Sequence, residues 1–307
     1  MDIAQVAPEL RAPLRRTPKI NPASWLTRTA AGIALGLMPA AKVPGVTIRS
    51  IRSGGARLRL YIPAVRRSRA ALLWIHGGGY IIGAAVQDDR MCAATALALG
   101  APVISVEYRL APKHRFPAAL DDCHAVWTWL QASAASLDID PARIAIGGES
   151  AGGGLAACLV QRIHDAPGPK AAAQWLFCPM LDDRTAADRD LDAVRHFVWD
   201  NTSNLFAWGS YLGRPAGAGE APPYAVAARR TDLAGLPPAW IGVGEIDLFF
   251  REDHAYAERL RAAGVETEFK AVPAAPHAIE AWAPEAPLSK ALVAEAHAWL
   301  AERLAGD

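Results

Sequence analysis

The sequence RIAIGGESAGGGLAACLVQRI, residues 143–163, joins a short apolar run to a helix-like run through a glycine-rich turn. At its centre, Gly148-Glu149-Ser150-Ala151-Gly152 forms a GxSxG motif. We predict a strand at Arg143–Ile146 and a helix at Leu155–Ile163, and strand, sharp turn and helix is the context that this motif requires. Because glycines flank the turn on both sides, the backbone can lift the Ser150 hydroxyl above the sheet, where a base can reach it.

Two other interpretations of this stretch are weaker. The glycines could serve only to pack the strand closely on the helix, with no chemistry attached. A dinucleotide site is disfavoured, because residues 147–154 do not fit GxGxxG and no acidic residue follows a second strand as that site needs.

Around this stretch, short apolar runs alternate with helix-like segments, as parallel strands with crossover helices require. Upstream, Val46–Ile51, the turn Ser53-Gly54-Gly55 and Arg57–Ile62 read as a β-hairpin in which Leu58, Leu60 and Ile62 alternate with Arg57, Arg59 and Tyr61. The fold class is therefore α/β, with an antiparallel edge on a mostly parallel twisted sheet flanked by helices. The predicted strands after the hairpin are Ala71–Ile75, Val103–Val106, Arg143–Ile146, Gln174–Cys178, Trp240–Val243 and Thr267–Val272.

Two segments interrupt this alternation. Residues 182–227 lie between two predicted strands and contain charges, aromatic residues and a Gly/Pro/Ala-rich stretch. Residues 1–45 precede the hairpin and include apolar helical material without a sheet partner. We predict that both form a helical cap, and that residues 46–181 and 228–307 are the two parts of one catalytic domain.

A second motif, His76-Gly77-Gly78-Gly79, follows the strand Ala71–Ile75 directly. Three successive glycines expose backbone N–H groups that can stabilise a negatively charged oxygen of a tetrahedral intermediate. A further donor is expected at the N–H of Ala151, the residue after the nucleophile. On its own the glycine run is equally consistent with a flexible turn, and His76 itself is interpreted as a structural hydrogen-bonding residue.

The expected order of the remaining residues is an acid and then a histidine base. His277 lies on a loop after the strand Thr267–Val272, where a base can face the nucleophile. His254 and His297 lie within helical patterns, so we interpret them as solvated or packed.

The acid is predicted to be Asp247, which follows the strand Trp240–Val243 at its carboxyl end, where functional loops gather. Glu245 is closer to the strand but less well placed in the loop. Glu252 and Asp253 begin a helix and are interpreted as caps. Asp247 would orient the His277 ring and stabilise its charged form.

The composition narrows the function classes. The chain has 307 residues, 52% of them hydrophobic, and a net charge of +1, with no Lys/Arg-rich run to attract nucleic acid or an anionic membrane surface. Its four cysteines are scattered among apolar neighbours, and no basic-then-apolar leader opens the sequence, so we expect a cytoplasmic protein. The apolar run Ala30–Ala41 is too short for a membrane span and is predicted to be a helix covering apolar surface. No clustered metal-ligand spacing is present, so no metal or cofactor is expected.

Taken together, the motifs resemble the hormone-sensitive-lipase-like family of α/β-hydrolases, of the bacterial carboxylesterase type. The resemblance runs from about residue 45 to the C-terminus. Ala278-Ile279 depart from the family, in which a glycine and an aromatic residue often follow the histidine, and Glu149 stands where aspartate is more frequent. The motifs, in the family's order, are His76–Gly79, Tyr108-Arg109-Leu110-Ala111-Pro112 with Phe116-Pro117-Ala118-Ala119, Gly148–Gly153, Gly244–Asp247 and His277.

The resemblance implies the α/β-hydrolase fold and a serine carboxylesterase acting on small, short-acyl or aryl esters without a cofactor. It implies that Ser150 is the nucleophile, Asp247 the acid and His277 the base, with oxyanion donors at Gly78, Gly79 and Ala151, for one of which Gly77 could substitute. It also makes Tyr108-Arg109 with Asp121 and Asp122 a buried structural knot. A deacetylase, lactonase or amidase is the nearest alternative, and a non-catalytic small-molecule receptor a more distant one. The oligomeric state is left open, a homodimer included.

Overall fold

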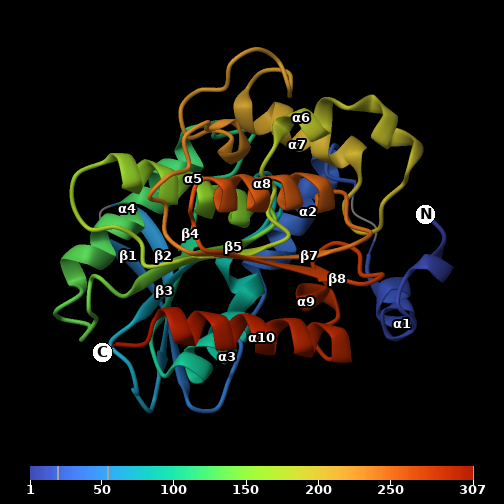
Figure 1. The fold of residues 1–307 in the computed structure, drawn as a ribbon. Helices are drawn as coiled ribbons and strands as arrows, with labels where there is room; N and C mark the ends of the chain where they lie inside the picture. The colour runs from blue at the N-terminus through green and yellow to red at the C-terminus, as the bar shows by residue number, and fades with distance from the viewer. Residues whose placement is uncertain (19–20, 54, 307) are drawn as a thin grey trace.

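A computed structural model describes residues 1–18, 21–53 and 55–306, and these form a single eight-stranded sheet with helices on both faces (Figure 1). The strand order is β1-β2-β4-β3-β5-β6-β7-β8. The strands are β1 Val46–Ser53, β2 Ala56–Pro63, β3 Ala71–Ile75, β4 Val103–Glu107, β5 Ile144–Glu149, β6 Gln174–Phe177, β7 Ala239–Gly244 and β8 Thr267–Val272. Every strand predicted from the sequence is present within one to three residues of its expected ends.

The predicted antiparallel edge is confirmed. β1 pairs with β2, and β2 pairs with β4, in antiparallel register, whereas all later neighbours are parallel. Gly54, in the predicted turn, lies outside the described residues. The predicted alternation along β2 is wrong at Tyr61, which is fully buried and donates a hydrogen bond of 2.8 Å from its hydroxyl to Asp89. Helices cover both faces of the sheet here, so the side of β2 that carries Arg57 and Arg59 is buried at Tyr61 although Arg57 is exposed.

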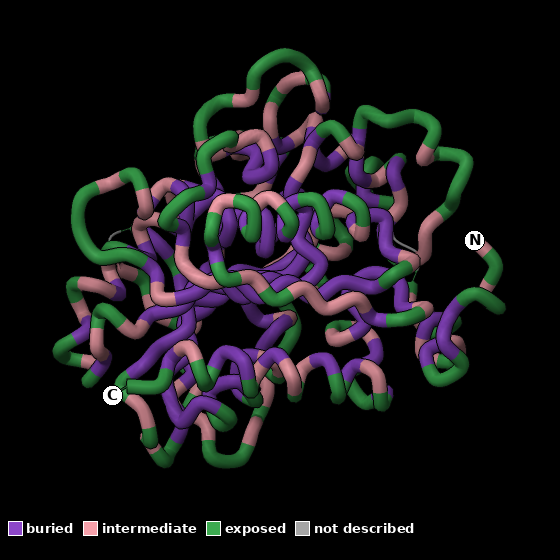
Figure 2. The backbone as a smooth tube through the Cα atoms, viewed as in Figure 1, coloured by how far each residue is buried: buried purple, intermediate pink, exposed green. Residues whose placement is uncertain are grey.

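The helices divide between the two faces of the sheet. In Figure 1, α3, α9 and α10 lie on one face and α4, α5 and α8 on the other, and the two main hydrophobic clusters follow this division. Figure 2 shows the sheet between them as the buried centre of the molecule. The helices are α1 Pro8–Arg16, α2 Trp25–Gly36, α3 Asp89–Leu99, α4 Ala118–Ser133, α5 Ala151–Asp165, α6 Asp183–Ala187, α7 Asn201–Leu212, α8 Phe250–Ala262, α9 Ile279–Trp282 and α10 Pro287–Arg303.

The insertion between β6 and β7 carries α6 and α7, on the same side of the sheet as α8 (Figure 1). α7 packs on the catalytic domain through its inward face. There, Tyr211 stacks on Tyr80 with ring centroids 4.1 Å apart, and Trp208 lies 5.3 Å from the same ring. Aromatic contacts of this kind bury large areas, so α7 is held firmly over the loop that follows β3.

The N-terminal segment packs on the rest of the chain through α1, whereas the apolar surface of α2 is not buried as predicted. α1 is anchored by Leu10 and Leu14, which are buried in the cluster that also contains α3 and α10. α2 does not cover apolar surface as predicted: none of its residues is buried, and Trp25 is 66% exposed. Other helices cover the sheet faces, and α2 contacts the insertion through Arg28, whose guanidinium lies 4.9 Å from the Phe206 ring.

The four cysteines, Cys92, Cys123, Cys158 and Cys178, are free and buried, as expected for small hydrophobic residues. Among the described helices, none is long and apolar enough to cross a membrane.

Candidate active site

Ser150 lies at the turn between β5 and α5 in a strained backbone conformation. Its φ is 55° and its ψ is −120°, a combination that residues with a side chain rarely adopt. Neighbouring glycines make the turn sterically feasible, since a Cβ atom on Gly148 would lie 2.4 Å from the carbonyl oxygen of Gly152, and one on Gly152 2.0 Å from that of Ile75. The turn therefore brings the Ser150 hydroxyl to the carboxyl ends of the strands.

His277 reaches this hydroxyl from the loop after β8. Its Nε2 lies 2.9 Å from Ser150 Oγ, and only 4% of each residue is exposed. Trp282 Nε1 donates a hydrogen bond of 2.7 Å to the His277 carbonyl oxygen, and the Phe249 ring lies edge-on to the imidazole at 5.2 Å. Backbone and ring are thus both held in the orientation that faces Ser150.

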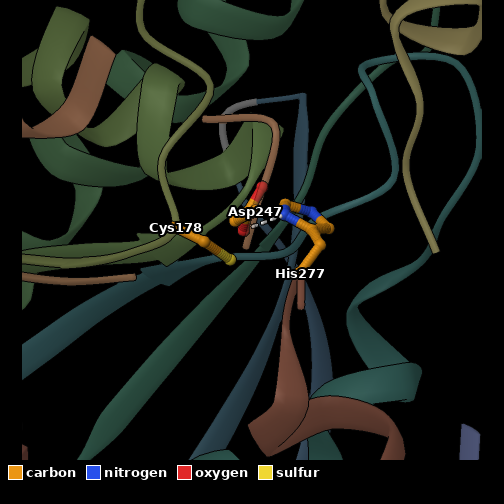
Figure 3. Close-up of side chains that lie close together, drawn as sticks. All are labelled: Cys178, Asp247 and His277. Carbon is orange, nitrogen blue, oxygen red and sulfur yellow. Dashed lines mark hydrogen bonds and ion pairs between the residues drawn. The ribbon is translucent and has the colours of Figure 1, made fainter. Parts of the chain in front are cut away.

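Asp247 completes the arrangement at the carboxyl end of β7. Its Oδ2 lies 2.8 Å from His277 Nδ1, and its Oδ1 accepts a hydrogen bond of 3.0 Å from the backbone N–H of Phe249. Figure 3 shows the carboxylate and the imidazole facing each other, with Cys178 beside them. With Nδ1–H donating to the carboxylate, Nε2 is the hydrogen-bond acceptor for the Ser150 hydroxyl.

The other acids considered for this role, Glu245, Glu252 and Asp253, form no hydrogen bond with His277. Glu245 is exposed to solvent. Glu252 and Asp253 are buried inside the first turn of α8, and the expectation that they cap the helix is wrong for both. Glu252 accepts hydrogen bonds from the backbone N–H groups of Leu181 and Asp182, and neither side-chain oxygen of Asp253 has a partner among the described residues. The loop after β6 passes over this turn, and its backbone N–H groups donate to the Glu252 carboxylate where the N–H groups of α8 were expected to do so.

The glycine loop after β3 has no room for side chains. Gly78 has φ +117°, and a Cβ atom there would lie 2.1 Å from the carbonyl oxygen of Ile82. A Cβ on Gly79, with φ +59°, would lie 2.3 Å from the ring of Trp199. One on Gly77 would lie 3.5 Å from Ser150 Cβ, so the loop passes directly beside Ser150.

The N–H groups of Gly77, Gly78 and Gly79 form no hydrogen bond with other described residues. They are therefore available to an oxygen bound next to Ser150. Ala151, the fourth predicted donor, begins α5 immediately after Ser150.

His76 supports this loop from beneath. It is fully buried, its ring stacks on Tyr108 at 4.2 Å, and the Tyr108 hydroxyl donates a hydrogen bond of 2.9 Å to its carbonyl oxygen. Burial lowers the pKa of His76, so the ring is neutral. Its contacts are those of a structural residue, in agreement with the sequence interpretation.

The predicted buried knot around Arg109 is wrong. Arg109 does pair with Asp122, at 2.9 Å, but its side chain is 49% exposed. Asp121 pairs instead with Arg162 on α5, also at the surface. The two aspartates are adjacent on α4 and point to different neighbours, so a single buried cluster cannot form; only the Tyr108 ring is buried.

Three acids with raised pKa values were not predicted as site residues: Asp88 and Glu149 are buried, and Glu280 is half-buried. Burial raises the pKa of Glu280 to about 7 and that of Asp88 to about 6, and it raises the pKa of Glu149 well above the usual range. Glu280 lies three residues after His277, and Glu149 directly precedes Ser150. Their positions beside Ser150 and His277 in the sequence could have identified these two residues, but the sequence does not show how far they are buried.

The two other late histidines lie in helices, as predicted: His254 in α8 and His297 in α10. His297 packs against Trp175 with ring centroids 5.7 Å apart, and its Nε2 lies 2.9 Å from Thr95 Oγ1. Burial lowers its pKa to about 4. Neither histidine contacts Ser150.

This gives a prediction for acid stability. The folded pKa of His297 is below its unfolded value of about 6.5, so the stability that depends on the neutral ring is complete above that pH and is lost as pH falls towards 4. Between pH 7 and pH 4 the free energy of unfolding of the wild type should fall by about 3 kcal/mol more than that of His297→Gln. Urea unfolding measured across this range checks the result; a difference that stays constant would contradict it.

Comparisons with known proteins agree with this geometry. Residues 72–281 match the family described as "alpha/beta hydrolase fold". The chain is 36% identical over 222 residues to Carboxylesterase NlhH of Mycobacterium tuberculosis, covering 70% of this chain and 68% of that protein. It is 33% identical over 214 residues to Ethyl acetate hydrolase of Pseudomonas putida, covering 68% and 65%. Among solved structures, Bacterial Heroin Esterase superposes with a TM-score of 0.91 at 35% identity, covering 99% of both chains.

Proposed function

The chain belongs to the family with the alpha/beta hydrolase fold and is a hydrolase of carboxylic esters, and we propose that it cleaves small esters through an acyl-enzyme intermediate on Ser150. One observation carries the proposal. Ser150 Oγ, His277 and Asp247 form a continuous hydrogen-bonded chain, with distances of 2.9 and 2.8 Å, between buried side chains. Nucleophile, base and orienting acid within hydrogen-bond reach are the arrangement that nucleophilic catalysis needs.

In the first half of the reaction, His277 Nε2 takes the proton of the Ser150 hydroxyl as Oγ attacks the ester carbonyl. The oxygen that becomes negative is stabilised by the N–H groups of Gly77, Gly78, Gly79 and Ala151. Asp247 stabilises the imidazolium that forms. His277 then gives the proton to the departing alcohol, which leaves Ser150 acylated.

In the second half, the same imidazole deprotonates a water molecule, which attacks the acyl-enzyme carbonyl. The acid is released and Ser150 recovers its proton through His277. Every step uses groups of the chain itself, and no metal or cofactor enters it.

The preferred substrates are proposed to have short acyl groups. Trp199, only 8% exposed, packs its ring against Gly79, so it limits the space beside the oxyanion loop. Each further CH₂ of an acyl chain gains about 0.8 kcal/mol only where the pocket has room for it. The Pseudomonas putida relative is named Ethyl acetate hydrolase, which supports a small substrate.

Trp199→Ala should therefore move the optimum of kcat/KM towards longer acyl chains. The removed ring leaves space beside Gly79, and acyl esters that clash in the wild type would fit. Rates on a series of p-nitrophenyl esters from acetate to decanoate check this. Trp25→Ala, which removes an exposed indole on α2, serves as the control and should leave the series unchanged. An unchanged optimum in Trp199→Ala would contradict the proposal.

We further propose that residues 1–45 and 182–227 act together as a cap over this pocket. The two segments touch: the N-terminal ammonium donates a hydrogen bond of 3.1 Å to the Arg195 carbonyl oxygen, and Arg28 lies over Phe206. Residues 19 and 20 of the first segment lie outside the described part of the chain. A cytoplasmic location is proposed on the four free cysteines, which a reducing compartment would maintain.

Labelling with a fluorophosphonate, followed by peptide mapping, tests the nucleophile and the reaction class together. The label is expected on the peptide that contains Ser150 and nowhere else. Labelling of another serine would reject the assignment. An unlabelled protein that binds aryl esters without turnover would favour a receptor on the same fold.

A further inference from the structure

Cys178 is a third potential metal ligand beside the His277–Asp247 pair. Its Sγ, a ring nitrogen of His277 and a carboxylate oxygen of Asp247 all lie within 4.8 Å of one another. In Figure 3 the thiol points towards the other two side chains. We propose that these three residues bind a thiophilic divalent cation such as Zn²⁺, and that the bound ion switches the enzyme off.

The ligand types and their spacing fit such an ion. Zn²⁺ accepts nitrogen, oxygen and sulfur ligands at about 2.0 to 2.3 Å in tetrahedral geometry, which sets its ligand atoms roughly 3.3 to 3.6 Å apart. The present distances, all below 4.8 Å, require side-chain shifts of about 1 Å to reach that geometry. Water would occupy the fourth position.

All three candidate ligands are buried: Cys178 is 2% exposed, His277 4% and Asp247 5%. A bound divalent ion stabilises the thiolate form of a cysteine that coordinates it, and the carboxylate of Asp247 balances part of the ion's charge.

The effect on the reaction follows from the imidazole, and it rests on the roles proposed above for Ser150 and His277. In the catalytic form, Nδ1 carries the proton and Nε2 accepts from Ser150. When the ion binds Nδ1, that proton moves to Nε2, and the Cys178 thiol releases one proton to solvent. Nε2–H then donates to Ser150 Oγ and cannot take its proton, so nucleophilic attack stops.

Cys178 is the deciding ligand. His277 and Asp247 alone lie at hydrogen-bond distance, 2.8 Å, and offer only two ligands. Inhibition by Zn²⁺ should therefore be reversed by a chelator in the wild type, and Cys178→Ala should raise the half-inhibitory Zn²⁺ concentration about tenfold or more, each variant measured against its own metal-free rate. Cys158→Ala removes an equally buried thiol on α5 and should respond as the wild type does.

Binding is measured separately from activity in Ser150→Ala, which keeps the three ligands. Titration with Co²⁺ should produce a thiolate-to-cobalt charge-transfer band with one ion per chain, and this band should be absent from Ser150→Ala/Cys178→Ala. Equal Zn²⁺ inhibition of the wild type and Cys178→Ala, or no Cys178-dependent band, would overturn the proposal. The cobalt result does not depend on turnover, so it decides the metal site even if the proposed nucleophile is wrong.

Discussion

Ser150→Ala should lower kcat on a short aryl ester by about 10⁴- to 10⁶-fold and abolish labelling by a fluorophosphonate. Ser150 Oγ is the atom proposed to form the covalent intermediate, and the alanine variant has no group that can replace it. The oxyanion donors and the substrate pocket remain, so a small residual rate above the uncatalysed reaction is expected. Steady-state kinetics and mass spectrometry of the labelled protein check both parts.

The backbone at position 150 should tolerate this change, because alanine and serine share the Cβ atom that the positive φ strains. Ser105→Ala is a suitable control: Ser105 is fully buried in β4, away from the triad, and its hydroxyl has no partner among the described residues. It should retain activity and label normally. Persistent labelling of Ser150→Ala would reject Ser150 as the nucleophile.

Asp247→Asn should lower kcat/KM by about 10⁴-fold with little change in the fold. The asparagine amide can donate to His277 Nδ1, which leaves the ring proton on Nε2, and Nε2 then cannot accept the proton of Ser150. The oxygen of asparagine can still accept the hydrogen bond from the Phe249 N–H. The loss should therefore appear in the rate and not in the melting temperature.

Glu245→Gln is the matched control for this variant, since it removes a carboxylate charge two residues away on an exposed side chain. It should change kcat/KM by less than about twofold, because a solvent-exposed charge is screened from the site. Equal and large losses in both variants would mean that the acid of the site is not Asp247 alone.

Much of the fold could be predicted because its signals are local. β3 and β8 have the ends expected from their apolar runs, and the GxSxG turn was recognisable from the strand before it and the helix after it. The contact between Ser150, His277 and Asp247 could be predicted for a related reason. Ser150, Asp247 and His277 each follow a strand, and the carboxyl ends of parallel strands meet at one edge of a sheet.

The predictions that were wrong concern burial and hydrogen bonding, which depend on contacts with residues distant in the sequence. The apolar run that became α2 was expected to be buried, but it has no described buried residue because the sheet faces were already covered. Tyr61 was assigned to solvent by alternation and is buried by the second layer of helices. Glu252 was interpreted as a helix cap, and the loop after β6 supplies its actual donors.

The sequence by itself determined the choice and the chain order of the three candidate residues. Ser150 lies on a glycine turn, and Asp247 and His277 each follow a strand, so their neighbours along the chain identify them. Only the tertiary structure decided that Cys178, at the end of β6, lies against the pair formed by Asp247 and His277. These residues are 69 and 99 positions away in the sequence, so no spacing motif connects them. Their proximity comes from the pairing of β6, β7 and β8, because neighbouring parallel strands end side by side and bring their following residues within reach of one ion.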